Sequence, residues 1–243
     1  MDHIQIPAKR ITEFREFIFS WWKINARDLP WRHTADPYLI LVSEIMLQQT
    51  QVSRGLPKYR EFITAFPDVE HLAHASTADV LRLWKGLGYN RRALYLKKTA
   101  EAIVTTHQGV FPKTKETLMS LPGVGAYTAA AIQVFAFRND ECMVDTNIRR
   151  IITQFFFSGE LQKESIVEDV ARMLVPKGKS WEWHQALMDY GALELKHEVA
   201  RIPKKVSARM PKDSKKKRVP FIQTERFLRG RIIDELRERA WDS

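Results

Sequence analysis

Hydrophobic residues recur every three to four positions along most of this chain. In residues 10–24 they include Ile11, Phe14, Ile18 and Trp21, a spacing that predicts an amphipathic helix with its aromatic side chains in the core. Similar spacing, or apolar runs of sufficient length, predict further helices at residues 39–51, 56–65, 77–84, 91–106, 162–174, 181–195 and 224–241. No segment alternates convincingly between apolar and polar residues, and hairpin turn signals are absent. The pattern therefore predicts an all-α fold.

Glycine and proline interrupt this helical pattern at three places. Pro30 and Pro37 mark a loop between the first two helices, and Gly86 and Gly88 break the chain within GLGYN. The third place is LPGVG, residues 121–125, in a segment that is predicted to be helix, tight turn, helix. Two glycines in this spacing let the backbone turn sharply and approach another molecule. The next helix offers free N–H groups at its N-terminus, so a DNA phosphate would suit this site.

Two acidic residues have unusual surroundings. Glu44 lies inside LILVSEIMLQQTQV, and no Lys or Arg occurs between Leu39 and Ser53 to pair with it. Apolar surroundings favour the neutral carboxyl and raise its pKa. Asp145 begins the helix of VDTNIRRIITQFFF, and a helix N-terminus favours the carboxylate anion. We therefore expect a protonated acid and an ionised acid, which suit proton donation and charge stabilisation respectively.

The composition narrows the class of protein. The chain has 243 residues, 44% of them hydrophobic, which is enough for a substantial core. No apolar stretch approaches the roughly 20 residues needed to cross a bilayer. The N-terminus lacks the basic-then-apolar layout of a signal peptide. We expect a soluble monomer in the cytoplasm, associated with the nucleoid.

Charge and cysteine content point to a partner and exclude some cofactors. Of the net charge of +10, most lies in residues 201–218, where nine Lys or Arg accompany one Asp. Nucleic acid suits this run better than a membrane, because prolines interrupt it and it has no apolar face. The single cysteine, Cys142, excludes internal disulfides and any zinc site or iron–sulfur cluster held by four cysteines of the chain. Its expected role is that of a small, semi-buried apolar residue.

The motifs together resemble a known family. LPGVGAYTAAAI, with Asp145 eighteen residues after Tyr127, is similar to the helix–hairpin–helix of the DNA glycosylase superfamily that includes endonuclease III and MutY. DLPWR, DPY, SEIMLQQTQV and GLGY resemble segments of the MutY-type adenine glycosylases, and the resemblance covers about residues 25–195. It implies a two-lobed helix–hairpin–helix glycosylase fold. The implied parts are a six-helix barrel at residues 28–138, a second helical lobe from residues 1–27 and 139–200, and a basic linker with a final helix at residues 201–243.

The resemblance also implies a reaction, the hydrolysis of the N-glycosidic bond of adenine mispaired with guanine or 8-oxoguanine. Glu44 would protonate the base, and Asp145 would stabilise the positive charge that develops on the sugar. Tyr127 occupies the position at which endonuclease III-type enzymes carry a Lys that forms a Schiff base. A monofunctional glycosylase without efficient strand cleavage is therefore expected. Arg32 and Asn147 would shape the base pocket.

Contacts with mismatched double-stranded DNA follow from the same resemblance. Since the target base must leave the stack, side chains are needed to enter the duplex. The residues expected to wedge into it or fill the gap are Gln48, Gln49, Leu87 and Tyr89. Those expected to meet phosphate at the hairpin are Leu121, Gly123, Val124 and Gly125, and the backbone carbonyls of Leu121 and Val124 would hold K⁺ or Na⁺. Four cations, equally consistent with a solvated face and with phosphate contacts, are Arg91, Arg92, Lys97 and Lys98.

Departures from the MutY pattern leave alternatives open. Leu195 lies where the first cysteine of a 4Fe–4S cluster is usual, and no later cysteine follows, so no cluster is expected. The residues up to Ser243 are too few for a domain that recognises 8-oxoguanine, so a preference for it over guanine is not implied. At two positions, Asn90 and Thr146, the sequence resembles the thymine/uracil mismatch glycosylases of the superfamily instead. The alternatives are excision of T or U opposite G, and a non-catalytic DNA-binding module that retains the hairpin.

Overall fold

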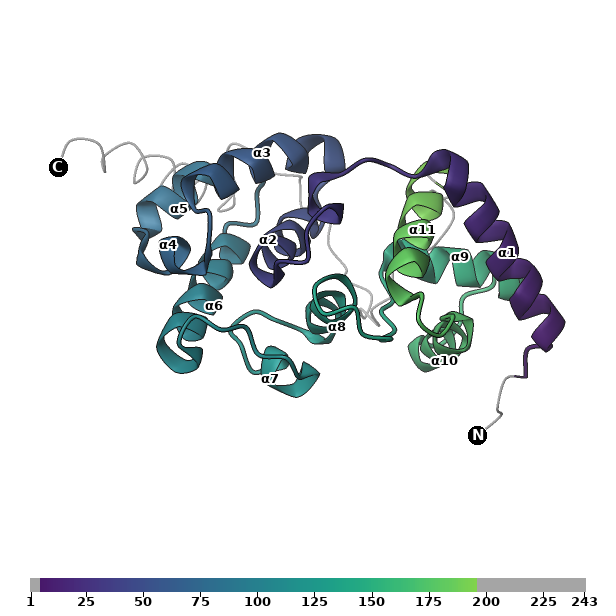
Figure 1. The fold of residues 1–243 in the computed structure, drawn as a ribbon. Helices are drawn as coiled ribbons and strands as arrows, with labels where there is room; N and C mark the ends of the chain where they lie inside the picture. The colour runs from purple at the N-terminus through teal and green to yellow at the C-terminus, as the bar shows by residue number, and fades with distance from the viewer. Residues whose placement is uncertain (1–4, 196–243) are drawn as a thin grey trace, which may run out of the picture.

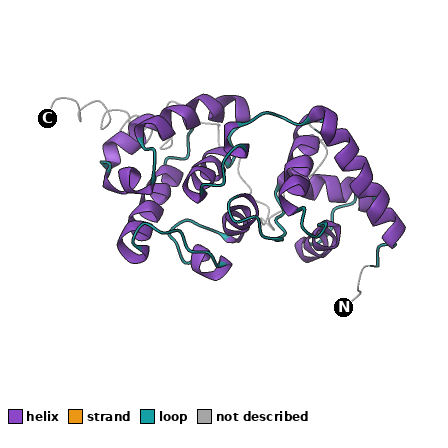
Figure 2. Ribbon diagram, in the orientation of Figure 1, coloured by secondary structure: helices purple, strands orange, loops and turns teal. Residues whose placement is uncertain are grey.

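The computed structural model describes residues 5–195, and these residues form helices and loops without a strand (Figure 2). The all-α prediction is confirmed. The α-helices are α1 Ala8–Asn25, α2 Pro37–Leu47, α3 Val52–Ala65, α4 Val69–His74, α5 Thr77–Leu83, α6 Arg91–His107, α7 Lys115–Met119, α8 Ala126–Phe135, α9 Thr146–Phe157, α10 Glu164–Leu174 and α11 Ser180–Leu193. A 3-10 turn, Pro30–Arg32, precedes α2. The linker and helix predicted for residues 201–243 lie outside the described residues.

Short polar side chains determine where several helices begin. Asp36 accepts a hydrogen bond from the N–H of Tyr38, and Pro37 starts α2 with a fixed φ. Asp68 caps α4 in the same way, through the N–H of His71. This helix has six residues, too few for a repeating hydrophobic pattern, and it was not predicted.

None of the helices in residues 5–195 is long and apolar enough to cross a membrane.

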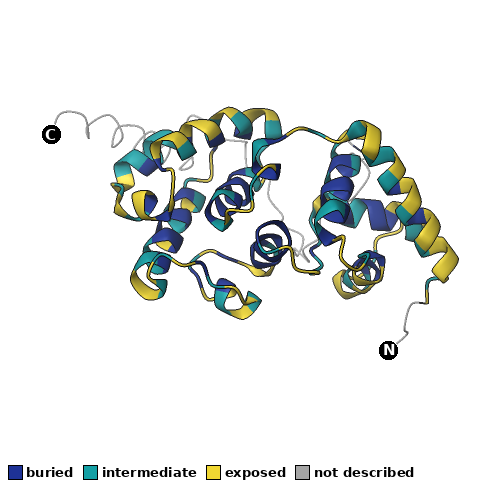
Figure 3. Cartoon of the chain, viewed as in Figure 1, coloured by how far each residue is buried: buried dark blue, intermediate teal, exposed yellow. Residues whose placement is uncertain are grey.

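The larger of two hydrophobic cores surrounds α2. Eight of the eleven residues of α2 are buried, and the helix packs against α3, α6 and α8. Helix α8 is buried even more completely, with eight of its ten residues buried, and its small residues Ala129, Ala130 and Ala131 let neighbours approach closely. Figure 3 shows the two helices as mostly dark blue. The larger core thus surrounds α2, the helix that carries the unpaired acid.

The second core joins the two ends of the described chain. Phe14 and Ile18 of α1 pack with Ile151 of α9, Val167 of α10 and Trp183 of α11. Figure 1 shows α1 lying beside α11 at the opposite end of the molecule from α3 to α5. Helices α9 and α10 are amphipathic, so their apolar faces can be buried only against the other helices.

Two connections cross from one core to the other, residues 26–36 and residues 136–145. Met143, on the second connection, packs into the larger core, although the predicted boundary assigned it to the second lobe. The division at residues 28–138 and 139–200 therefore stays a prediction. Helix α9 begins just after this connection, and its N-terminus lies near α2 and α8. The candidate site is at this junction.

Candidate active site

Glu44 lies in the middle of α2 with 8% of its surface exposed. Burial raises the pKa of Glu44 to about 7, a hydrogen bond with Tyr127 opposes this rise, and the charge of Asp145 adds to it. The rise is what its apolar surroundings in the sequence predict. A carboxyl with this pKa holds a proton near neutral pH and can also release it.

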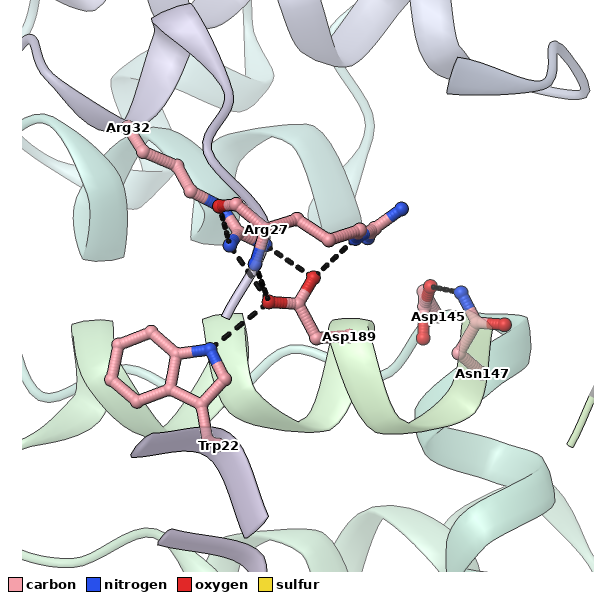
Figure 4. A network of polar contacts seen from close by, with 6 residues as sticks. All are labelled: Trp22, Arg27, Arg32, Asp145, Asn147 and Asp189. Carbon is pink, nitrogen blue, oxygen red and sulfur yellow. Dashed lines mark hydrogen bonds and ion pairs between the residues drawn. The ribbon is translucent and has the colours of Figure 1, made fainter. Parts of the chain in front are cut away.

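Asp145 caps the N-terminus of α9. Its Oδ1 accepts a hydrogen bond from the N–H of Ile148 at 2.7 Å. Its Oδ2 accepts one from Nδ2 of Asn147 at 2.9 Å, and Figure 4 shows this second bond. Arg150 donates to Oδ1 of Asn147 at 2.7 Å, which orients the amide. Asn147 therefore orients the carboxylate of Asp145. The sequence predicted Asn147 in the base pocket and did not predict this contact.

The helix terminus favours the anion of Asp145, as expected, but burial opposes it. Burial raises its pKa, although the hydrogen bonds from Ile148 and Asn147 and the charge of Arg150 oppose the rise. The sequence argument considered only the helix terminus, whereas the position between α2, α8 and α9 removes water from the carboxyl. Both acids of the site thus have raised pKa values.

Tyr127 joins the two acids. It lies in the first turn of α8, and its hydroxyl is hydrogen-bonded to the carboxyl of Glu44. Burial, and then the charges of Glu44 and Asp145, raise the pKa of Tyr127 well above its ordinary value of 10.0. The phenol therefore keeps its proton and can donate it to a hydrogen bond. The structure brings together the three residues that were predicted to be catalytic.

Arg32 is bound to an acid that was not predicted, Asp189 of α11. Nη1 and Nη2 of Arg32 donate to its two carboxylate oxygens at 2.8 and 2.7 Å. Arg27 and Nε1 of Trp22 donate to the same carboxylate, which is fully buried (Figure 4). Burial opposes ionisation, but the hydrogen bonds and charge of Arg32 hold the pKa of Asp189 below its ordinary value. Asp189 lies in an apolar helical run, as Glu44 does, and this was the signal that could have identified it.

The predicted wedge residues fall into exposed and buried sets. Gln49 and Tyr89 are exposed and have positive φ angles of 55° and 47°. Gln48 is half-buried, and its Nε2 lies 3.5 Å from the hydroxyl of Thr128. Leu87 is 4% exposed and belongs to the larger core. The expectation that Leu87 projects into DNA beside Tyr89 is therefore wrong in this conformation, because its side chain packs into the larger core beneath the loop.

The hairpin between α7 and α8 presents backbone to solvent. Gly123 and Gly125 are exposed, whereas the side chains of Leu121 and Val124 are buried. Gly123 has φ 80°, and a Cβ at this position would lie 2.6 Å from Cβ of Tyr95, so no other residue fits without movement. The N–H of Val124 donates to the carbonyl of Leu121 at 3.1 Å, which closes the turn.

Two of the four cations of α6 are not available to DNA. Lys97 is 8% exposed, and its Nζ donates to the carbonyl of Ala73 at 2.9 Å and to Glu101 at 2.6 Å. Arg92 is engaged by backbone carbonyls of two neighbouring segments. Both original interpretations, a solvated face and phosphate contacts, are wrong for these two residues. Burial of a long side chain cannot be inferred from a periodic pattern of charges.

An open groove of about 760 Å³ runs from Tyr127 along α8 towards α10. Neither Glu44 nor Asp145 lines it, and four acidic side chains do, from Asp140, Glu141, Glu164 and Glu168. Lys115 and Arg172 also line the groove and are paired with Glu141 and Glu168, so the lining is net acidic, which disfavours phosphate.

Comparisons with known proteins identify the family of the chain. Residues 42–177 match the family model of the HhH-GPD superfamily base excision DNA repair protein. The chain is 36% identical to the adenine DNA glycosylase of Mycobacterium tuberculosis strain H37Rv, over 98% of this chain and 84% of that relative. It is 32% identical to the thymine/uracil-DNA glycosylase of Methanothermobacter thermautotrophicus, over 76% of this chain and 86% of that relative. A solved thermostable thymine-DNA glycosylase matches with a TM-score of 0.71 at 32% identity, over 76% of this chain and 87% of that chain.

Proposed function

The chain belongs to the HhH-GPD superfamily of base excision DNA repair proteins and is a DNA glycosylase, and we propose that it releases adenine mispaired with guanine or 8-oxoguanine. One observation carries the choice of adenine, the buried carboxyl of Glu44 with a pKa of about 7. Adenine leaves poorly as an anion, so its ring must be protonated before the N-glycosidic bond breaks. Glu44 is the group at this site that can supply the proton.

Asp145 provides the negative charge that the reaction needs on the sugar side. As the bond breaks, positive charge develops at the anomeric carbon and its ring oxygen. That charge favours ionised Asp145 and so opposes the effect of burial on its pKa. Ile148 and Asn147 already hold both carboxylate oxygens, so little reorganisation is required when the charge appears. Water then completes hydrolysis at the anomeric carbon and leaves an abasic site.

Tyr127 limits the reaction to hydrolysis. A Schiff base with the sugar requires an amine, and the phenol of Tyr127 has no nitrogen to form one. The hydroxyl instead orients the carboxyl of Glu44. We therefore propose a monofunctional glycosylase without efficient strand cleavage.

The target base reaches this site by leaving the duplex, because the reacting atoms cannot be reached in the stack. We propose that Gln49 and Tyr89 enter the duplex and that Gln48 supports them. The exposed backbone of the hairpin and the N-terminus of α8 suit a phosphate, and the carbonyls of Leu121 and Val124 are the proposed ligands of K⁺ or Na⁺.

We propose that the protein acts as a monomer on mismatched double-stranded DNA of the nucleoid. It would work without an iron–sulfur cluster, because Cys142 alone cannot supply the four thiolates that such a cluster uses.

A second candidate is the release of thymine or uracil opposite guanine. Asn90 and Thr146 favour it, and a thymine/uracil-DNA glycosylase is among the similar proteins. These pyrimidines leave more readily as anions than adenine does, so Asp145 could act without an acid. The requirement for Glu44 therefore distinguishes the two candidates.

End-labelled duplexes carrying A·G, A·8-oxoguanine, T·G or U·G would test the proposal. The duplexes are incubated with the protein, and abasic sites are then cleaved with alkali. Product from the two adenine substrates, and loss of that product with Glu44→Gln, is expected. Product from T·G and U·G alone would replace adenine by the second candidate. No product from any duplex, with a folded protein that binds DNA, would overturn both candidates and favour a binding module.

A further inference from the structure

Arg92, in the first turn of α6, donates hydrogen bonds to the free carbonyl groups at the C-terminal end of α2. Its Nη1 donates to the carbonyl oxygens of Ile45 at 2.8 Å and Met46 at 2.9 Å. These carbonyls lack helical partners because α2 ends at Leu47. Nη2 reaches Oγ1 of Thr50 at 3.2 Å, just beyond the turn that carries the two glutamines. One guanidinium therefore spans the turn after α2.

The same guanidinium also holds the loop that precedes α6. Nη2 donates to the carbonyl oxygens of Leu87 at 3.1 Å and Gly88 at 3.3 Å. Its carbon lies 5.4 Å from the centre of the Trp84 ring and 5.6 Å from that of Tyr89. Cation–π attraction thus adds to the hydrogen bonds, and the exposed Tyr89 ring is held from one side.

Each of these two segments contains a strained residue at its exposed tip. Gln49 and Tyr89 have positive φ angles of 55° and 47°, a conformation that costs free energy for residues with a Cβ. Such conformations persist where surrounding contacts enforce them. In both segments the bonds of Arg92 fall on backbone or side-chain atoms within four residues of the tip.

We propose that Arg92 is a positioning residue that fixes the turn of Gln49 and the loop of Tyr89 as one rigid unit, so that both side chains enter the duplex together when the base is flipped. This inference rests on the proposed function only in that the two tips meet DNA. It does not depend on which base is released. A planar group with several donors is required, because a lysine ammonium cannot bridge carbonyls on two segments in this geometry.

A phosphate contact does not explain this residue. Nη1 and Nη2 are occupied by protein oxygens, and Nε is buried. Burial lowers the pKa of Arg92, which is a cost that a surface phosphate contact would not impose. The neighbouring Arg91 is different, since it is exposed and donates to the hydroxyl of Tyr95 at 2.6 Å. Arg91 is therefore the matched control.

The test compares Arg92→Lys with Arg91→Lys, which both conserve charge. Single-turnover excision is measured on the best mismatched duplex of the wild-type protein, and on the same duplex with an abasic analogue opposite the target base, where the base is already poorly stacked. For Arg92→Lys we expect a loss of about 10- to 100-fold on the mismatch and less than about 3-fold on the pre-opened duplex. Arg91→Lys should leave the ratio of the two excision rates unchanged, because any phosphate contact of Arg91 would affect both duplexes alike.

Equal losses on the two substrates, or no loss on either, would overturn the proposal, because a residue that supports only the fold does not distinguish them. If Arg92→Lys does not fold, Thr50→Ala removes one of the five contacts and should lower excision of the mismatch by about 2- to 5-fold, with no effect on the pre-opened duplex. A substrate-independent effect of Thr50→Ala would also reject it. The adenine assignment can fail without affecting this ratio, since the substrate is the base that the wild-type protein releases.

Discussion

Glu44 and Asp189 are both carboxyls inside buried helices, and their surroundings are opposite. Glu44, 8% exposed in α2, has the Tyr127 hydroxyl and a second acid, Asp145, as neighbours. Asp189, 0% exposed in α11, accepts hydrogen bonds from two arginines and a tryptophan. Burial raises the pKa of Glu44 to about 7, whereas Arg32 holds that of Asp189 below its ordinary value.

Burial alone therefore does not give an acid its role. Without a positive partner, the buried carboxyl of Glu44 binds a proton, which it can transfer to a substrate. With two cations, the carboxyl of Asp189 stays ionised and connects residues 27 and 32 to α11. The surroundings of Glu44 suit proton transfer, whereas those of Asp189 join the two cores on either side of the site.

Glu44→Gln should have the largest effect on catalysis. It removes the transferable proton but keeps the shape, so adenine excision should fall by about 10³-fold. The free energy of unfolding should not decrease, because an uncharged group replaces a buried acid. Single-turnover excision and urea denaturation measure the two quantities. Retained excision of adenine would show that Glu44 is not the acid.

Asp189→Asn should give the largest loss of stability. It leaves the buried cation of Arg32 without its counter-charge, which should lower the free energy of unfolding by about 3–5 kcal/mol. The control is Glu164→Gln, whose partner Arg149 lies 2.8 Å away at the surface and where the loss should be below about 1 kcal/mol. Similar losses in the two variants would contradict the difference between buried and exposed pairs.

The pH dependence should separate the two acids further. The pKa of Glu44 rises from 4.5 to about 7 on folding, so its protonation stabilises the fold below pH 4.5, and this contribution is lost as pH rises through about 7. The difference is roughly 3 kcal/mol. Excision should fall about 10-fold per pH unit above that value.

Comparing the wild type with Glu44→Gln isolates this contribution. The comparison is necessary because burial lowers the pKa of His184 to about 4, so His184 favours the fold above about pH 6.5 and loses that effect as pH falls through 4. A stability difference between wild type and variant that does not change between pH 5 and 8 would contradict the raised pKa of Glu44.

Gly191→Ala should give the smallest effect. It tests whether α11, the helix that carries Asp189, also supports the carboxyl of Asp145. A Cβ at Gly191 would lie 2.6 Å from Cβ of Asn147, which positions Asp145. We expect a loss of about 1–3 kcal/mol in unfolding free energy from overpacking. Excision should fall about 10-fold, from displacement of Asp145. Unchanged excision with reduced stability would confine α11 to a structural role.

Features that depend on nearby residues were predictable from the sequence. The helical periods, the turn at LPGVG and the isolation of Glu44 in an apolar run are properties of short segments, and the structure contains each of them. Asp145 as the cap of α9 is equally local. Family-specific motifs added the grouping of Glu44, Tyr127 and Asp145, which no single segment contains.

Features that depend on distant partners were decided by the tertiary structure. Asp189 and Glu44 are alike in sequence, and only the approach of Arg27 and Arg32 from the loop before α2 makes one of them ionised. Arg92 lies on a basic helix face in sequence and in a ring of backbone carbonyls in space. The physical reason is common to these cases. Whether a buried charge is neutralised, paired or used depends on the groups that folding brings within a few ångströms, and neither periodicity nor composition specifies them.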